Sequence, residues 1–495
     1  MNKKFILIIL LSIANFCSAQ YIQKERALED LHEFKQLLET HSSYFQLSDF
    51  DFETRFTQLR TEFSAVDSIP RHQLAYAFEK IIAETIDRHA SIKMENFDKD
   101  AIDMYNLYFP FALAPLNGKT VALVKNKSTK KYDYYSKKYP FLKSINNTPT
   151  LQFINKYAYK RKNSPEAAKL YYGLHDVRDI GESFFKQGEL NHTKVDLVLT
   201  NGKKDKAITL PLNKRRNRWN DITQDYSSWK EMIFKKPFEY SKLDKWIDDS
   251  IAYLQIPLMI SYQDYTDFET YLQSTMTSYK DAKALIIDIR GNGGGTRDIL
   301  NTLAGYIVPA EQSPWIANVA YVRTDQQLDE DIESMRGRYL YNYYSEKLTD
   351  KDREAIDIFK NGFKTELTFD SKKFSHPFYM VLNSNETPLK CPVYILVNEK
   401  CFSAASVFAS AFKGLANLKI VGTTTNGSSG RSARFFLENS SIKIKLSTML
   451  SFQRNGKTLD GNGTVPDMII EMNRAQVFGE QDTQLEWLQG LINRD

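Results

Sequence analysis

The sequence predicts an α/β protein, and three observations lead to this fold class. Residues 22–95 show the i, i+3, i+4 apolar spacing of amphipathic helices. Residues 107–213 contain short alternating segments that are typical of strands. Residues 235–475 alternate apolar strand segments with helical segments, as in a sheet covered by helices. A length of 495 residues is enough for about three domains, which matches these three regions.

Composition excludes several classes of protein. Apolar residues make up 42% and charged residues 26%, which are globular values and argue against a largely disordered chain. The net charge of +5 is too small for a nucleic-acid-binding surface, so no nucleic-acid partner is expected. Three cysteines exclude a disulfide scaffold and a Cys-rich zinc module. Since no His or Cys pair has metal-ligand spacing either, we expect neither a metal nor a cofactor.

Residues 1–19 have the pattern of a secretory signal peptide. Two lysines precede an apolar run from Phe5 to Phe16, and small residues end with Ala19 at the predicted cleavage site. The run of about 12 residues is shorter than the roughly 20 that span a bilayer, so no stable membrane span is expected after cleavage. We therefore expect an exported protein, periplasmic or secreted, from a Gram-negative bacterium. Cys391 and Cys401 are expected to be free and buried, because an apolar strand of about 23 Å separates them.

The N-terminal helical region is predicted over residues 20–106. Its helices are expected over 22–38, 52–63 and 74–86, with His89 at the end of the third. A single His at that position is more often a core or helix-C-terminal residue than a catalytic one.

The second region, residues 107–213, is predicted to be β-rich. Strands are expected over 120–124 and 141–145, a helix over 151–159, and a hairpin over 195–212 with Asn201-Gly202 in its loop. An exposed basic linker follows at 214–218.

The third region, residues 235–475, is predicted to be an α/β domain. Its strands are expected over 251–256, 284–289, 393–397 and 419–421, and its helices over 265–279, 296–307 and 403–415. Nearly unbroken apolar strands are typical of a sheet buried on both faces. Residues 312–388 interrupt the alternation, so we interpret them as an insertion that is helical from 325 to 363 and able to act as a lid.

A glycine-rich turn at residues 288–295 lies between a predicted buried strand and a helix. Backbone N–H groups at such a turn favour negative charge. The turn lacks the lysine of a phosphate loop and the third glycine of a dinucleotide fingerprint, which favours a hole for a transient oxyanion. Taken alone, the segment is better explained as a tight turn.

Ser403 and Asp460 are the other candidate site residues. Ser403 follows a buried strand and opens a helix, so it is either an N-cap or a nucleophile whose oxyanion meets the N–H of Ala404. Asp460 lies in a turn-rich segment, where an acid either orients a histidine or caps a turn.

Four segments together resemble the C-terminal-processing, or tail-specific, serine protease family. They are IIDIRGNGGG (286–295), VYILVNEKCFSAAS (393–406), IVGTTTNGSSG (420–430) and GNGTVPD (461–467), in the family's order. The resemblance covers about 235–470 and implies a crotonase-like ββα superhelix. Because a PDZ domain often precedes this catalytic domain, residues 107–213 look like a divergent PDZ-like domain.

The resemblance also implies roles for individual residues. Ser403 matches the family's nucleophile. Many members have a general-base lysine just after the glycine that corresponds to Gly427, but Ser428 stands there. The segment Asp87-Arg88-His89 instead resembles the tricorn-core-like branch, which uses a histidine and a late acid.

These matches assign His89 as general base and Asp460 as the acid that orients it. The oxyanion hole is expected from the N–H of Ala404 and one from Gly293 or Gly294. The predicted function is an exported serine endopeptidase that hydrolyses peptide bonds in polypeptides through a Ser-His-Asp type site and an acyl-enzyme. The alternative is a catalytically inactive peptide-binding protein that retains the protease fold.

Overall fold

The computed structural model describes residues 21–94, 102–158, 162–189, 191–223, 239–326 and 330–494. The predicted signal peptide lies outside these ranges. No helix within them is long and apolar enough to cross a membrane. Cys391 and Cys401 are free and buried, which confirms that prediction.

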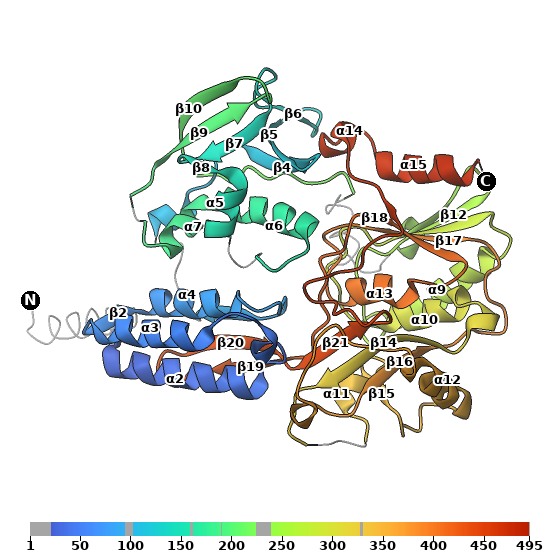
Figure 1. Ribbon diagram of the computed structural model, residues 1–495. Coiled ribbons are helices and arrows are strands. Elements are labelled where there is room, and N and C mark those ends of the chain that lie inside the picture. Colours follow the sequence, from blue (N-terminus) through green and yellow to red (C-terminus); the bar gives the residue numbers. More distant parts are fainter. Residues whose placement is uncertain are drawn as a thin grey trace, which may run out of the picture.

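A six-stranded sheet forms the centre of the third region (Figure 1). Its order is β11 (Asp244–Ile247), β12 (Ile251–Gln255), β13 (Ala284–Asp288), β17 (Val393–Val397), β18 (Leu418–Gly422) and β22 (Met468–Ile469). All pairs are parallel except β11 with β12. Every residue of β13 and β17 is buried, as their apolar runs predict. The helices of this region include α9 (Phe268–Ser278), α10 (Asp298–Ile307) and α13 (Ala404–Phe412).

A four-stranded antiparallel sheet packs on the same core. Its order is β15 (Tyr341–Asn342), β16 (Phe378–Leu382), β14 (Trp315–Val322) and β21 (Met449–Gln453). Three of these strands come from residues 312–388, where only α11 (Glu333–Arg336) and α12 (Asp350–Lys360) are α-helices. The expected helix over 325–363 is therefore wrong for most of its length. The segment is part of the domain's own core, because Trp315 and Phe378 are buried in it.

The N-terminal region contains α2 (Lys24–His41), α3 (Phe52–Ser64) and α4 (Arg71–Ile82), which confirms three helices. Strands β1 (Tyr21–Gln23) and β2 (Ser68–Pro70) form a small antiparallel pair there. The third helix ends at Ile82, earlier than expected, and the Thr85 hydroxyl donates to the Ile82 carbonyl (2.7 Å). Such side-chain bonds compete with a further helical turn.

The three helices share a core with a sheet built largely from the C-terminal part of the chain. This sheet has the order β19 (Ser432–Phe436), β20 (Ile442–Ser447), β3 (Ser91–Met94), all antiparallel. Buried Ile92 and Ile444 belong to the same cluster as the helix residues. Figure 1 shows α2, α3 and α4 beside β19 and β20. Strand β3, which begins nine residues beyond the end of α4, thus joins the N-terminal region to the third region.

The second region is a seven-stranded antiparallel sheet with three helices. The path is β10 (Asp205–Pro211), β9 (Lys194–Thr200), β7 (Phe141–Ile145), β5 (Lys119–Lys125), β4 (Ala112–Leu116), with β6 (Tyr132–Tyr134) on β5 and β8 (Thr148–Pro149) on β7. The helices are α5 (Thr150–Tyr157), α6 (Glu166–Arg178) and α7 (Ile180–Lys186). The predicted strands, hairpin and first helix are confirmed.

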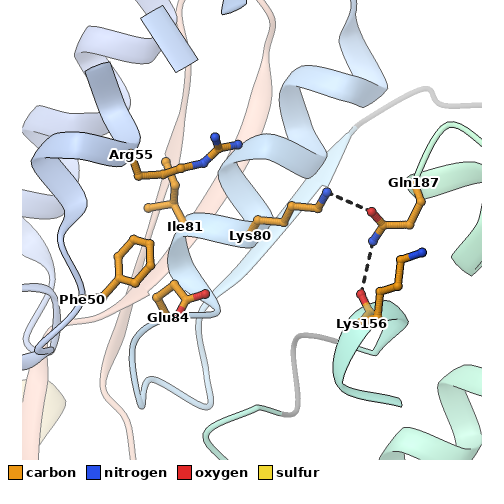
Figure 2. A pocket seen from close by; sticks show the side chains of 7 residues that line it. All are labelled: Phe50, Arg55, Lys80, Ile81, Glu84, Lys156 and Gln187. Carbon is orange, nitrogen blue, oxygen red and sulfur yellow. Dashed lines mark hydrogen bonds between the residues drawn. The ribbon is translucent and has the colours of Figure 1, made fainter. Parts of the chain in front are cut away.

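A pocket of about 280 Å³ lies where the first and second regions meet (Figure 2). The Lys80 ammonium donates to Gln187 Oε1 (3.1 Å), and the Gln187 amide donates to the Lys156 carbonyl (3.4 Å). The first of these bonds links α4 to the second region. None of the predicted site residues lines this pocket.

Candidate active site

Ser403 lies at the turn between β17 and α13, in a conformation that non-glycine residues rarely adopt. Its φ is +55° and its ψ is −126°. Such backbone strain costs of order 1–3 kcal/mol and is typical of functional sites. The Ser403 side chain makes no capping hydrogen bond, so the N-cap explanation of this serine does not hold. Ser403 instead lines a cavity of about 230 Å³.

His89 lies in the loop between α4 and β3, seven residues beyond the helix rather than at its end. The Asp87 carboxylate fixes this loop by accepting from the backbone N–H groups of His89 and Ala90, both at 2.9 Å. It also accepts from the N–H (2.8 Å) and hydroxyl (2.6 Å) of Ser447, the last residue of β20. Asp87 of the Asp-x-His segment therefore anchors the loop and holds His89 against the third region.

The His89 and Ser403 side chains meet, with Nε2 of His89 3.3 Å from the Ser403 hydroxyl oxygen. Burial lowers the pKa of His89 to about 3, and the charges of Lys445, Arg338 and Arg88 act in the same direction. The imidazole is therefore neutral near pH 7, and a neutral imidazole can accept the serine proton at Nε2.

Ser428 occupies the space between His89 and Asp460. The Ser428 hydroxyl contacts Nδ1 of His89 and lies 3.4 Å from Asp460 Oδ1. Within the described ranges, Asp460 makes no direct hydrogen bond to the imidazole. In the sequence, Ser428 is marked only as the place where a lysine is absent, and its position directly after Gly427 is the one signal that it belongs to the site.

Asp460 is completely buried and has several donors around it. It accepts from the backbone N–H groups of Arg88 (3.0 Å) and Ser429 (3.1 Å) and from the Tyr44 hydroxyl (3.1 Å). Burial raises the pKa of Asp460 to about 7, and the nearby Asp87 charge contributes. The carboxyl group therefore titrates within the range where proteases commonly work.

The expected oxyanion donors lie against the nucleophile turn, but they differ in availability. The Gly294 N–H donates to Asn292 Oδ1 (2.8 Å) and is therefore occupied within its own loop. Among the described residues, the N–H groups of Gly293 and Ala404 have no hydrogen-bond partner. Gly294 instead permits close packing: its φ is +99°, and a Cβ there would lie 2.7 Å from the Phe402 carbonyl oxygen and from Ser403 Cβ.

The chain resembles known proteins in sequence and in fold. Residues 250–470 match the model of Peptidase family S41. The chain is a serine peptidase. Two solved structures resemble almost the whole chain: mature CPAF complexed with lactacystin (15% identity, 95% of this chain and 99% of that chain, TM-score 0.62) and mature CPAF (16%, 95% and 98%, TM-score 0.61). At these identities the likeness concerns the mixed α/β fold. The residues matched by the family model include Ser403, Ser428 and Asp460, whereas His89 lies outside them.

Proposed function

We propose that this chain is an exported serine endopeptidase that cleaves polypeptides through an acyl-enzyme formed on Ser403. The observation that carries the proposal is the 3.3 Å approach of His89 Nε2 to the Ser403 hydroxyl. A nucleophile within hydrogen-bond reach of a neutral imidazole is the arrangement that activates serine.

His89 acts as the general base, and Ser428 and Asp460 orient it. As Ser403 attacks the substrate carbonyl, His89 Nε2 takes the serine proton and then passes it to the leaving amine. Nδ1–H donates to the Ser428 hydroxyl, which in turn donates to Asp460. This chain of donors selects the tautomer whose Nε2 is free to accept. Water then hydrolyses the acyl-enzyme, with the same imidazole as its base.

The tetrahedral oxyanion is bound by backbone N–H groups. We assign this role to Ala404, the first residue of α13, and to Gly293, since the Gly294 N–H is already engaged. Loss of one such donor costs roughly 3 kcal/mol of transition-state stabilisation.

A catalytically inactive peptide-binding protein is the competing function. It predicts a disrupted site, with His89 too far from Ser403 to accept its proton. The distance between the two side chains favours the peptidase instead. The export part of the proposal rests on the sequence pattern of residues 1–19.

The proposal is tested with purified mature protein on casein and on internally quenched peptides blocked at both ends. We expect cleavage of both, loss of cleavage in Ser403→Ala, and a loss of about 10²–10⁴-fold in His89→Ala. Ser406→Ala is a matched control, because Ser406 lies on the same helix with its hydroxyl bonded to the Cys401 carbonyl. Equal cleavage by wild type and Ser403→Ala would refute the assignment.

A further inference from the structure

Two arginines line the cavity beside Ser403. Arg297 is only 5% exposed, and its guanidinium donates to the Arg338 carbonyl (3.1 Å) and the Ser429 hydroxyl (3.2 Å). Arg338, from the segment between β14 and β16, lines the same cavity. Neither guanidinium has a carboxylate within ion-pair distance in the described part of the chain. Both positive charges thus flank the nucleophile without a negative partner.

Another arginine of the same loop shows how this protein normally accommodates a buried guanidinium. Arg290 is bonded to the carboxylates of Asp288 (2.6 Å) and Asp482 (2.7 Å). These partners raise the pKa of Arg290 well above its usual value. Burial and the charge of Arg338 instead lower the pKa of Arg297 to about 9. Because an unpaired buried charge is costly, the exception at Arg297 calls for a functional reason.

The acidic groups near the cavity are directed elsewhere. Asp298, next to Arg297 in sequence, accepts from the Tyr262 N–H, the Thr296 hydroxyl and the Tyr339 hydroxyl, all at 3.0 Å. The positive field is reinforced by Arg431, whose charge acts on Arg338, and by Lys445, whose charge acts on His89. The cavity is therefore electropositive.

We propose that this cavity binds a carboxylate of the polypeptide substrate through Arg297 and Arg338, so that bonds next to Asp or Glu, or next to the terminal carboxylate, are cleaved preferentially. The inference rests on the proposed peptidase function and names its substrate class. A guanidinium is planar and offers paired donors that match a carboxylate, which gives geometric selectivity as well as charge.

Substrate charge would also affect the base. The cations around the cavity act on His89 and disfavour its protonated form. A substrate carboxylate beside Arg338 offsets that field and raises the pKa of the imidazole during proton transfer. Binding of an acidic substrate would thereby assist catalysis as well as recognition.

The experiment compares kcat/KM for four quenched peptides of one sequence. The first pair has an amidated C-terminus, with Glu next to the scissile bond in one peptide and Gln in the other. The second pair has Gln at that position, with a free C-terminal carboxylate near the scissile bond in one peptide and an amidated C-terminus in the other. We expect wild type to favour Glu over Gln, or the free over the amidated end, by about tenfold or more. A preference for Glu over Gln shows that the cavity binds an acidic side chain. A preference for the free over the amidated C-terminus shows that it binds the terminal carboxylate.

The variants Arg297→Gln and Arg338→Gln are expected to reduce that preference to within about twofold while neutral peptides are still cleaved. Arg338→Gln is the safer variant, because Arg338 is only half-buried. Arg336→Gln is the control, since Arg336 is exposed and paired with Asp331 in the same segment. A purely structural role of Arg297 would lower both rates equally and leave the ratio unchanged.

The possible failures are distinguishable. Ser403-dependent cleavage with no preference between the paired peptides overturns this inference and leaves the peptidase function standing. Cleavage that persists in Ser403→Ala, or absence of cleavage by wild type, overturns the peptidase function and this inference with it. Labelling of Ser403 by a fluorophosphonate confirms that each arginine variant retains a folded nucleophile site.

Discussion

The Ser428 hydroxyl contacts Nδ1 of His89, and it thereby fills the position next to the imidazole that an acid was expected to take. Asp460 lies behind it, 3.4 Å from the same hydroxyl. The orienting charge thus acts on the base through an intervening hydroxyl rather than by direct contact.

Removal of that hydroxyl should weaken catalysis without unfolding the protein. In Ser428→Ala, Nδ1 of His89 loses its partner, so the productive tautomer is no longer selected. We expect kcat to fall by about tenfold to a hundredfold with KM little changed, a smaller loss than for His89→Ala. Steady-state kinetics on a quenched peptide measures this. Ser428→Thr keeps a hydroxyl and should recover part of the rate; equal rates in wild type and Ser428→Ala would remove Ser428 from the mechanism.

The pH dependence of activity should be controlled by Asp460 rather than by His89. The pKa of His89 is about 3, so the imidazole is already neutral above pH 5, whereas the pKa of Asp460 is about 7. Activity is therefore expected to rise through about pH 7 as the carboxyl ionises and strengthens the bond from Ser428. In Asp460→Asn we expect a lower plateau and no such rise. If the acid limb of the pH profile, which is the rise of activity through about pH 7, were unchanged in Asp460→Asn, the titration of another group would cause it.

Removal of the Tyr44 hydroxyl should shift the acid limb of the pH profile by a small amount. Its hydroxyl donates to Asp460 Oδ2 (3.1 Å), and this bond favours the ionised carboxylate and lowers its pKa. Tyr44→Phe should therefore move the acid limb of the kcat/KM profile to higher pH. Tyr321→Phe, in the same aromatic cluster, is the control. A shift to lower pH in Tyr44→Phe would contradict the proposed role of the hydroxyl.

The close contact at Gly294 should make this position intolerant of any side chain. In Gly294→Ala the new Cβ would meet backbone and Ser403 Cβ at 2.7 Å, at a φ of +99°. We expect a clear decrease in the melting temperature together with a loss of activity. Gly293→Ala is the matched comparison, because nothing lies within 4 Å of its added Cβ. Equal melting temperatures for the two variants would show that the contact is unimportant.

The parts of the fold that could be predicted are those with local signals. Strands β13 and β17 are continuous apolar runs, and α10 and α13 follow them with clear helical patterns. The β14–β21 pairing joins segments far apart in the chain, and no local pattern specifies it. The local pattern of the charged, tyrosine-rich stretch beside β14 therefore predicts a helix that the structure does not contain for most of that length.

The candidate site also has parts with a local sequence signal and parts that depend on long-range contacts. Ser403 lies within a continuous motif, whereas the His89 assignment depended on a family resemblance. The contact of His89 with Ser428 follows from the pairing of β3 with β20, and short-range spacing contains no information about that pairing. The occupied N–H of Gly294 likewise depends on the folded position of the Asn292 side chain.

The pairing of β3 with β20 also has a consequence for biosynthesis. The base is held in place by a strand partner that ends at Ser447, more than 350 residues later in the chain. A polypeptide still emerging from the ribosome has neither this partner nor Asp460 until translation has passed residue 460. Its nucleophile is made earlier but lacks an oriented base. Proteolytic activity would therefore begin only after translation has passed these residues, and a shorter nascent chain would be inactive.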